Sequence, residues 1–325
     1  MINITLKQLR YFDALARELH FGRAAEACSV TQPALSMQIQ EFEQNLQLNL
    51  IERTRSGVQM TPQGEEVARR AAKILSETRD LIDLARSGDS LLTGALRLGV
   101  IPSVAPYVLP PLLPLLRQQH PELELSLRET PTRALVQEWA DGKLDVWLLA
   151  LPFKLSDIEV EPLVVERFVL AITGERELSE DVRATQDFVE HERLLLLEEG
   201  HCLRDQALSY CDLQQVKNLN TYGASSLSTI VELVSAGHGI TLLPEISLGV
   251  EARGRELKLM RFAEPEPRRT LGLVWRATSP RRSDFQELAR LVRDAAEPLV
   301  LAARESVAPD GGETSPKATK RKKAS

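Results

Sequence analysis

The chain has 325 residues, of which 43% are hydrophobic and 26% are charged. This length predicts about two globular domains, and the composition excludes a disulfide-stapled miniprotein, a collagen-like chain and a wholly disordered one. Taken alone, the net charge of −6 disfavours a nucleic-acid-binding protein. Residues 1–60 carry as many basic as acidic side chains, so the distribution of charge has to decide.

The sequence predicts neither a signal peptide nor a transmembrane helix, because its longest apolar stretches are short and broken by proline. Three cysteines, an odd number without a secretory signal, indicate a reducing compartment. We therefore expect a cytoplasmic protein without a membrane partner, in which any disulfide is transient.

Three helices are predicted at the N-terminus, over residues 6–19, 22–28 and from Thr31 onward. Thr31 is a favourable N-cap residue, and Pro33 is tolerated in the first turn of the third helix. The apolar or small side chains that the helical periodicity predicts to be buried are Leu6, Leu9, Phe12, Ala16, Leu19, Ala24, Ala25, Cys28, Leu35, Ile39, Phe42 and Leu46.

The outward face of the third helix carries no charge between Thr31 and Gln40. Polar groups on such a face can hydrogen-bond base edges in a DNA groove, and a helix N-terminus favours phosphate. By composition alone, a solvated helix surface is the more common explanation. Two short strands are expected at residues 49–52 and 58–60, and the arginines between them, Arg53 and Arg55, suit phosphate contacts, although arginines in a loop often have no such role.

A long helix is predicted from the N-cap Thr61 to about Arg86. Its apolar and small residues follow a heptad, which favours a coiled coil between two chains over packing on its own domain. Residues 87–90 are expected to form a hinge. The seam residues are Val67, Ala71, Ile74, Thr78, Leu81 and Ala85.

Strands alternate with helices from Ala95 onward, which predicts βαβ units, a parallel sheet and a ligand pocket at the carboxyl ends of its strands. The last residues, 306–325, are rich in Pro, Gly, Ser and Lys and are expected to be disordered. The predicted strands are 96–101, 124–129, 146–151, 167–172, 194–197, 240–243 and a return strand at 269–275, and the first predicted helices are 106–119 and 135–141.

Cys202 and Cys211 flank a run of good helix formers. Nine residues of helix separate two Cα atoms by about 13 Å along the axis, so these cysteines can form a disulfide only after the helix unwinds. The helix N-terminus and the nearby His201 and Arg204 favour the thiolate, which can attack a peroxide to give sulfenic acid and then a disulfide. By spacing alone, two ordinary buried cysteines are more common. Neither a metal nor a cofactor is expected, because Cys-x8-Cys with scattered histidines lacks zinc-ligand spacing.

The block F-G-R-A-A-E-A-C-S-V-T-Q-P-A-L-S-M-Q-I-Q-E-F-E, followed by L-I-E-R-T and T-P-Q-G, resembles the winged helix-turn-helix of the LysR-type transcriptional regulators. The resemblance implies an α/β chain with promoter DNA as a partner. Its implied domains are a winged helix-turn-helix at 1–61, a dimerisation helix at 62–87, a hinge at 88–94, a two-lobed periplasmic-binding-protein-like effector domain at 95–302 and a disordered basic tail at 303–325. The residues at DNA-contacting positions of the family are Thr31, Gln32, Pro33, Ser36 and Arg53.

Residues 200–211, G-H-C-L-R-D-Q-A-L-S-Y-C, together with G-V-I-P-S-V-A-P-Y, resemble the peroxide-sensing members of this family. The resemblance implies a cytoplasmic homotetramer that activates oxidative-stress genes with RNA polymerase. Hydrogen peroxide would oxidise Cys202, the peroxidatic cysteine, Cys211 would resolve it as a disulfide, and a reductant such as glutaredoxin or thioredoxin would reverse the change. The implied pocket residues are Ser103, Thr132, His201, Arg204, Asp205 and Arg269, of which Ser103 departs from the threonine more common in the family.

Two other functions remain in competition. A LysR-type regulator that responds to a small organic ligand would keep inert cysteines. A thiol peroxidase is disfavoured, because an enzyme has no need for a winged helix-turn-helix and a heptad helix. Oxidation that stops after one peroxide per subunit would favour the sensor over the enzyme.

Overall fold

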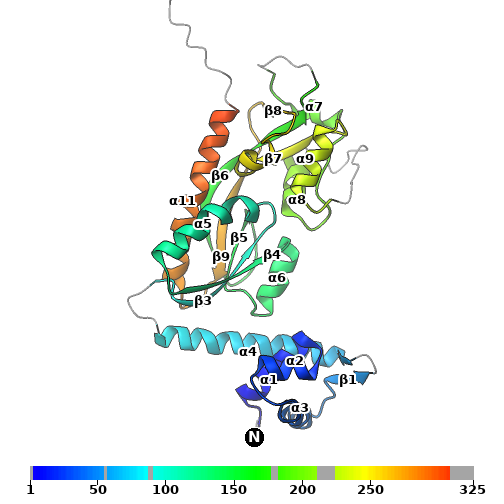
Figure 1. Cartoon of the computed structure of the whole chain (residues 1–325), viewed down its shortest axis with the longest axis vertical. Coiled ribbons are helices and arrows are strands. Elements are labelled where there is room, and N and C mark those ends of the chain that lie inside the picture. The colour runs from blue at the N-terminus through cyan, green and yellow to red at the C-terminus, as the bar shows by residue number, and fades with distance from the viewer. Residues whose placement is uncertain (1–2, 55–56, 87–90, 177–181, 211–223, 308–325) are drawn as a thin grey trace, which may run out of the picture. The chain divides into compact units, whose positions relative to one another are not determined.

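The computed structural model describes residues 3–54, 57–86, 91–176, 182–210 and 224–307. The fold is mixed α/β, as predicted, and Figure 1 follows it from the N-terminal helices in blue to the C-terminal helix in red. The chain divides into two compact units. The first consists of residues 1–164, 200–202 and 270–294, and the second of residues 165–199, 203–269 and 295–325. The predicted hinge at 87–90 lies outside the described residues.

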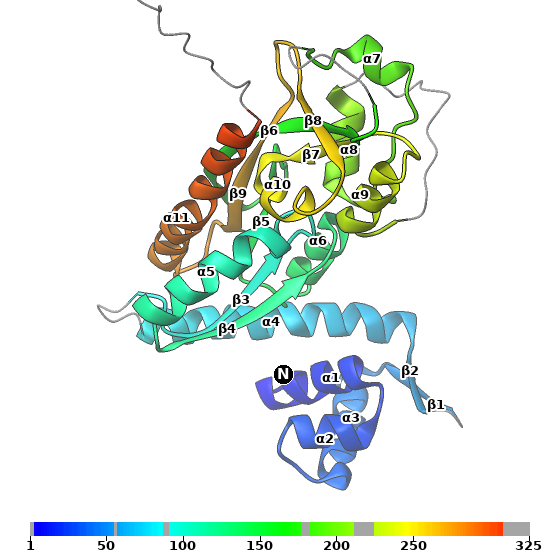
Figure 2. The same cartoon turned by 45° about the horizontal axis from the view of Figure 1, so that its top comes forward.

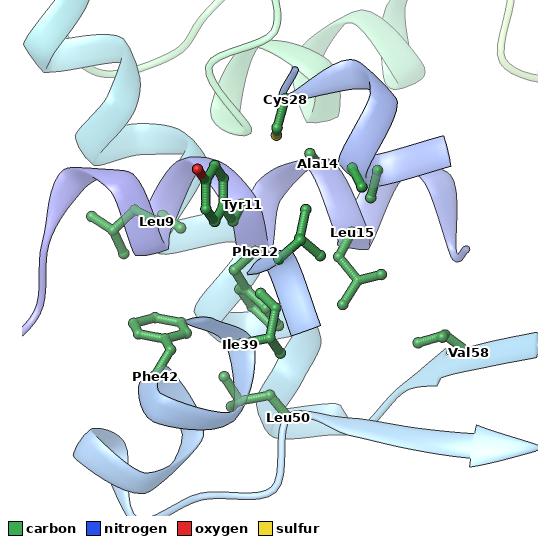
Figure 3. Packing of buried hydrophobic residues seen from close by; sticks show 14 residues of the cluster. Leu9, Tyr11, Phe12, Ala14, Leu15, Cys28, Ile39, Phe42, Leu50 and Val58 are labelled. Atoms are coloured by element: carbon green, nitrogen blue, oxygen red, sulfur yellow. The ribbon is translucent and has the colours of Figure 1, made fainter. Parts of the chain in front are cut away.

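The first unit begins with a helix-turn-helix and a β-hairpin. Its elements are α1 (Leu6–Glu18), α2 (Phe21–Ala27), α3 (Gln32–Leu46), β1 (Ile51–Thr54), β2 (Gly57–Met60) and α4 (Pro62–Arg86). The hairpin strands pair antiparallel. Phe12 of α1 packs against Phe42 of α3 with ring centroids 5.4 Å apart, and Ile39 and Leu50 complete the centre of this core (Figure 3). The predicted order of elements is therefore confirmed.

The buried stripe of α1 differs from the prediction at both ends. Leu6 and Leu19 are exposed, since Leu6 opens the first turn and Leu19 is a left-handed cap beyond the last one. The core instead takes Tyr11 and Leu15. The buried residues of α3 include Leu35, Ile39 and Phe42 as predicted, and Leu46 is half-buried.

The apolar residues of the long helix α4 differ in burial between its first and second halves. Thr61 caps it, accepting a hydrogen bond from the Gly64 amide at 3.0 Å. Ala71 is buried in the core of the helix-turn-helix, with Val67 packed beside it. Farther along, Ile74 is 46% exposed and Leu81 is 65% exposed. The first half of the predicted seam therefore packs on its own domain, and the exposed second half stays a predicted contact with another chain.

A parallel sheet of three strands forms the next part of the first unit. Strand β3 (Gly94–Val100) lies between β4 (Leu123–Glu129) and β5 (Val146–Leu151), with α5 (Ala105–Gln119) and α6 (Thr132–Ala140) in the connections (Figure 2). The predicted βαβ units are confirmed. The predicted return strand is β9 (Arg268–Arg276), which pairs antiparallel with β5.

The second unit contains an antiparallel arrangement around one long strand. Strand β6 (Ile158–Thr173), which enters from the first unit, pairs with β7 (Thr241–Pro244) and with β8 (Leu257–Arg261). The unit also contains α7 (Gln186–Glu190), α9 (Leu227–Ser235), the 3₁₀ turn η2 (Glu245–Ser247) and α10 (Leu248–Glu251). Two helices, α8 (Cys202–Tyr210) and α11 (Arg282–Ser306), begin in the first unit and end in the second.

Two predictions for this region are wrong. Residues 194–197 form no named strand, and only an isolated bridge joins Leu194 to Ile240. Residues 303–306 belong to α11 and not to the tail, and Ala303 is still buried one turn before the helix ends. The rest of the predicted tail, from residue 308, lies outside the described residues.

Candidate functional site: a helix-turn-helix and a thiol at a helix start

The start of α3 presents the predicted DNA-contacting residues. Thr31 is the N-cap, as predicted, although within the described chain its hydroxyl makes no capping hydrogen bond. Thr31, Gln32 and Pro33 are exposed, and Ser36 is half-buried. The first turn carries no acidic side chain. An exposed, uncharged helix start is compatible with a phosphate and with base edges.

Two residues that sequence reasoning missed hold this motif together. The His20 side chain caps α2, because its Nδ1 accepts hydrogen bonds from the amides of Gly22 and Arg23 at 3.1 and 3.3 Å. The Glu43 carboxylate accepts hydrogen bonds from the amides of Leu50 and Ile51 at 2.7 and 3.2 Å, and so anchors the start of the hairpin to α3. A capping signal could have indicated His20, whereas the contact of Glu43 depends on the tertiary fold.

The hairpin supplies the predicted wing. Ile51 pairs with Met60 and Thr54 with Gly57. The backbone of Arg53 lies in β1, and its side chain falls outside what the structure describes. The turn at residues 55–56, which contains the second predicted arginine, lies outside the described residues.

The predicted redox segment forms the helix that the sequence indicates. Gly200 has a φ of +97°, which favours glycine, and α8 then begins at Cys202. Cys202 is a half-buried free cysteine, and His201 beside it is buried. Cys211 lies outside the described residues. Cys202 thus lies in the first turn of α8, shortly after the left-handed backbone of Gly200.

Cys28 has a different environment from Cys202. It is 8% exposed and belongs to the core of the helix-turn-helix, as predicted. Burial raises the pKa of the Cys28 thiol above its usual value, and the positive charges of Arg10 and Arg17 only partly oppose this change. The protonated thiol is a poor nucleophile, so Cys28 has a structural role.

The two predicted hydroxyl residues lie in the first unit with Cys202. Ser103, between β3 and α5, is buried. Thr132 opens α6, and its Oγ1 is buried without a hydrogen bond among the described residues. A buried hydroxyl without a partner costs free energy, so the Thr132 hydroxyl is suited to a small polar ligand.

Three of the predicted pocket residues belong to the second unit. Arg204 donates from Nη1 to the Leu197 carbonyl at 3.1 Å, and this contact ties α8 to the preceding loop. Asp205 is exposed on α8. Arg269 is buried on β9, and its Nε donates to Glu166 Oε1 at 2.8 Å. The structure therefore assigns Ser103, Thr132, His201 and Cys202 to one unit and Arg204, Asp205 and Arg269 to the other.

Glu166 is a buried charged residue that sequence reasoning missed. Burial raises its pKa above the usual value, while the charge of Arg269 and the hydrogen bond from the Ile246 amide act in the opposite direction. The only sequence signal is a glutamate that interrupts the apolar run V-V-E-R-F-V-L-A-I of a strand.

The described ranges contain no group of three or more His, Cys, Asp or Glu side chains placed to hold a metal ion. None of the helices in those ranges combines the length and the apolar run that a membrane crossing requires.

Comparisons with known proteins decide the family. Residues 6–65 match the "Bacterial regulatory helix-turn-helix protein, lysR family", and residues 89–297 match the "LysR substrate binding domain". The chain belongs to the LysR family. The resemblance found in the sequence is thereby confirmed, and with it a regulator built from a DNA-binding helix-turn-helix and an effector domain.

Three LysR relatives are informative. The "Probable hydrogen peroxide-inducible genes activator" of Streptomyces viridosporus is 41% identical over 91% of this chain and 95% of its own length. The "HTH-type transcriptional regulator EstR" of Acinetobacter baylyi is 39% identical over 89% of this chain and 96% of its own. A solved full-length OxyR of Pseudomonas aeruginosa, in which a cysteine is replaced by aspartate, has a TM-score of 0.76 and 34% identity, covering 90% of this chain and 98% of that one.

Proposed function

We propose that this LysR-type protein activates oxidative-stress genes in response to hydrogen peroxide, which oxidises Cys202. The observation that carries the proposal is the half-buried free thiol of Cys202 in the first turn of α8, after the left-handed Gly200 and the buried His201. The relatives named as peroxide-inducible activator and as OxyR support the same signal.

The chemistry takes two steps. The Cys202 thiolate attacks one peroxide oxygen, the O–O bond breaks, and hydroxide leaves, so that sulfur becomes a sulfenic acid. The Cys211 thiol then attacks that sulfur and displaces water as the disulfide forms. Two electrons pass from the two thiols to one peroxide. A dithiol reductant such as glutaredoxin or thioredoxin returns both electrons and resets the protein.

Support for the pocket comes from the surroundings of its residues. The Thr132 hydroxyl, which has no hydrogen-bond partner in the described part of the chain, and the buried Ser103 are suited to hold the peroxide by hydrogen bonds. Arg269 carries a permanent positive charge, which stabilises the leaving hydroxide. His201, Arg204 and Asp205 complete the proposed surroundings of Cys202.

The disulfide changes the structure because α8 must unwind. Its nine residues extend about 13 Å, whereas the Cα atoms of a disulfide lie about 4.4–6.8 Å apart. Leu203 and Ala207 are buried on α8 and must leave their sites. Such repacking between two discrete arrangements can rotate one subunit against another.

We infer that the active protein is a homotetramer, a dimer of dimers that binds promoter DNA through residues 1–61 and dimerises through the exposed half of the helix at 62–87. Oxidation of the effector domain, residues 95–302, then changes the spacing of the paired α3 helices on DNA. The new arrangement recruits RNA polymerase. Thr31, Gln32, Pro33, Ser36 and Arg53 make the proposed DNA contacts.

The test compares wild type with Cys202→Ser in DNA footprinting before and after micromolar hydrogen peroxide. We expect the wild-type footprint and DNA bend to change and the variant's to stay in the reduced pattern, with equal affinity of both proteins in the reduced state. A variant that still responds fully contradicts the redox assignment. A wild type that ignores peroxide but responds to an organic effector supports the alternative regulator.

DNA contact is tested separately by Gln32→Ala. Loss of one bidentate base contact weakens specific binding by about 1–3 kcal/mol and relaxes the base preference at one position. The exposed Gln47, a C-cap at the other end of α3, provides the control variant Gln47→Ala. Equal affinity of all three proteins for the promoter and for random DNA contradicts the assignment of Gln32.

A further inference from the structure

Glu166 is one of the most buried charged residues of the second unit, and the proposed chemistry does not use it. Its carboxylate is fully buried, and each of its oxygens accepts a hydrogen bond. Oε1 accepts from Arg269 Nε at 2.8 Å, and Oε2 accepts from the Ile246 amide at 2.9 Å. Both oxygens are therefore fixed, one to a side chain and the other to the backbone.

The alternation of β6 brings two side chains to Arg269. Glu166 and Phe168 are two residues apart and share one face of the strand. The Arg269 guanidinium lies 5.8 Å from the centre of the Phe168 ring while its Nε bonds to Glu166. Two residues of one strand thus contact the guanidinium, Glu166 through an ion pair and Phe168 through its ring.

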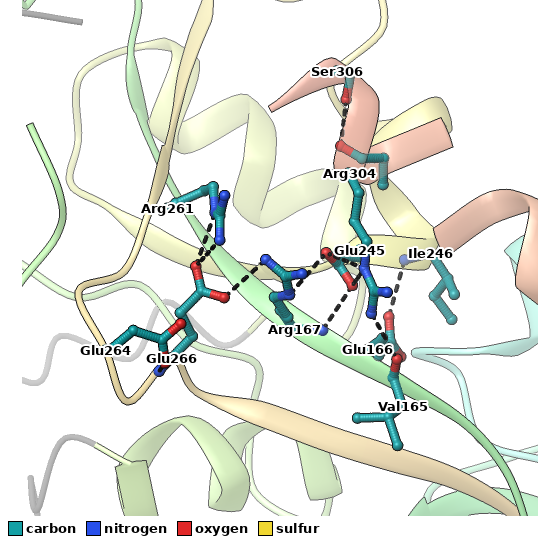
Figure 4. Close-up of polar contacts among 11 residues, drawn as sticks. Val165, Glu166, Arg167, Glu245, Ile246, Arg261, Glu264, Glu266, Arg304 and Ser306 are labelled. Carbon is teal, nitrogen blue, oxygen red and sulfur yellow. Dashed lines mark hydrogen bonds and ion pairs between the residues drawn. The ribbon is translucent and has the colours of Figure 1, made fainter. Parts of the chain in front are cut away.

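Two reciprocal hydrogen bonds join the backbone around Glu166 to η2. The Arg167 amide donates to Glu245 Oε2 at 2.9 Å, while the Ile246 amide donates to Glu166, so adjacent residues of β6 and η2 bond each other in pairs (Figure 4). Arg304 of α11 donates from Nε to the Glu245 carboxylate at 3.2 Å. The backbone that carries Glu166 is therefore held by hydrogen bonds with η2 and α11, which is what a residue that positions another side chain requires.

We propose that Glu166 is a positioning residue that sets where the Arg269 guanidinium lies during the reaction of Cys202 with peroxide. This inference rests on the proposed function. A carboxylate that only balanced charge could be one methylene shorter without consequence, since aspartate keeps the charge. A carboxylate that sets a position cannot, because a displacement of about 1 Å in a catalytic group costs up to about 100-fold in rate.

The experiment measures the second-order rate constant for oxidation of Cys202 by hydrogen peroxide in the full-length protein, with sulfenic acid trapped by dimedone. We expect Glu166→Asp to slow oxidation about 10- to 100-fold. Glu251 is the matched control, because it is also a buried glutamate of the second unit and pairs with Arg255 at 3.3 Å. Glu251→Asp keeps the wild-type rate.

A second comparison separates positioning from a general structural effect. In an Arg269→Gln background the carboxylate has no guanidinium to position, so adding Glu166→Asp changes the rate less than twofold. Phe168→Leu, which removes the ring beside the guanidinium, slows oxidation only in the presence of Arg269. This variant keeps the proposal testable even where Glu166→Asp does not fold, as thermal melting will show.

The outcomes distinguish a failure of the positioning role from a failure of the proposed function. A wild-type Cys202 that does not react with peroxide contradicts the proposed function. A reactive wild type with an equally reactive Glu166→Asp variant overturns the positioning role alone. Equal slowing by Glu166→Asp with and without Arg269 overturns it as well, because that result shows a structural effect.

Discussion

Shortening Leu203 should make the disulfide easier to form. Leu203 is 4% exposed in the helical, reduced state and must leave its site when α8 unwinds. Truncation of such a residue to alanine typically destabilises the state that buries it by about 2–5 kcal/mol. For a two-electron couple about 1.4 kcal/mol corresponds to 30 mV, so Leu203→Ala should lower the reduction potential of the Cys202–Cys211 pair by about 40–110 mV.

The assay equilibrates the protein with glutathione buffers of known potential and counts free thiols at each one. Ser209→Ala is the control, since Ser209 lies exposed on the same helix and loses no buried surface on unwinding. Its potential should equal that of the wild type. A Leu203→Ala variant with an unchanged or higher potential would refute the claim that the disulfide requires α8 to unwind.

Three further predictions follow from individual contacts. In Gly64→Ala the new Cβ would lie 2.0 Å from the Leu50 carbonyl oxygen, so we expect a loss of at least about 1–3 kcal/mol of DNA-binding-domain stability in thermal melting and a matching loss of DNA binding. Thr132→Val removes a buried hydroxyl without a partner among the described residues, and should leave unfolding free energy within about 1 kcal/mol while slowing peroxide oxidation more than about tenfold. Hydrogen bonding from Arg290 lowers the pKa of Glu287 below its usual 4.5, so the ionised carboxylate stabilises the folded protein above that pH, and this stabilisation is lost as the pH falls through the lower folded pKa. Glu287→Gln should therefore flatten the acid limb of the curve of unfolding free energy against pH. An unchanged acid limb would contradict the pairing.

Local signals in the sequence sufficed where one segment determines its own structure. Residues 202–210 were predicted as a helix because good helix formers follow Gly200, and α8 has those bounds. The N-cap Thr61 and the strand at 146–151 were predicted on the same kind of signal. Leu194 to Leu197 shows the limit, since four consecutive leucines meet the strand pattern but find only one bridging partner.

Contacts between distant residues could not be read from the sequence. Glu166 meets Arg269 across 103 positions of the chain, and no periodicity in β6 indicates which partner neutralises a buried carboxylate. The heptad of α4 likewise predicted one seam, whereas the structure gives Ala71 to the helix-turn-helix core and leaves Leu81 exposed. Burial depends on which surface packs against an apolar stripe in the folded chain, and the sequence of the stripe does not contain that information.

Peptide mapping by mass spectrometry detects the proposed peroxide-driven disulfide between Cys202 and Cys211. The full-length reduced protein, with its three cysteines, is treated with one equivalent of hydrogen peroxide per subunit, alkylated and digested. We expect Cys28 to be fully alkylated and the peptides containing Cys202 and Cys211 to be joined. Three alkylated cysteines after treatment, or a linkage that includes Cys28, would contradict the proposed disulfide.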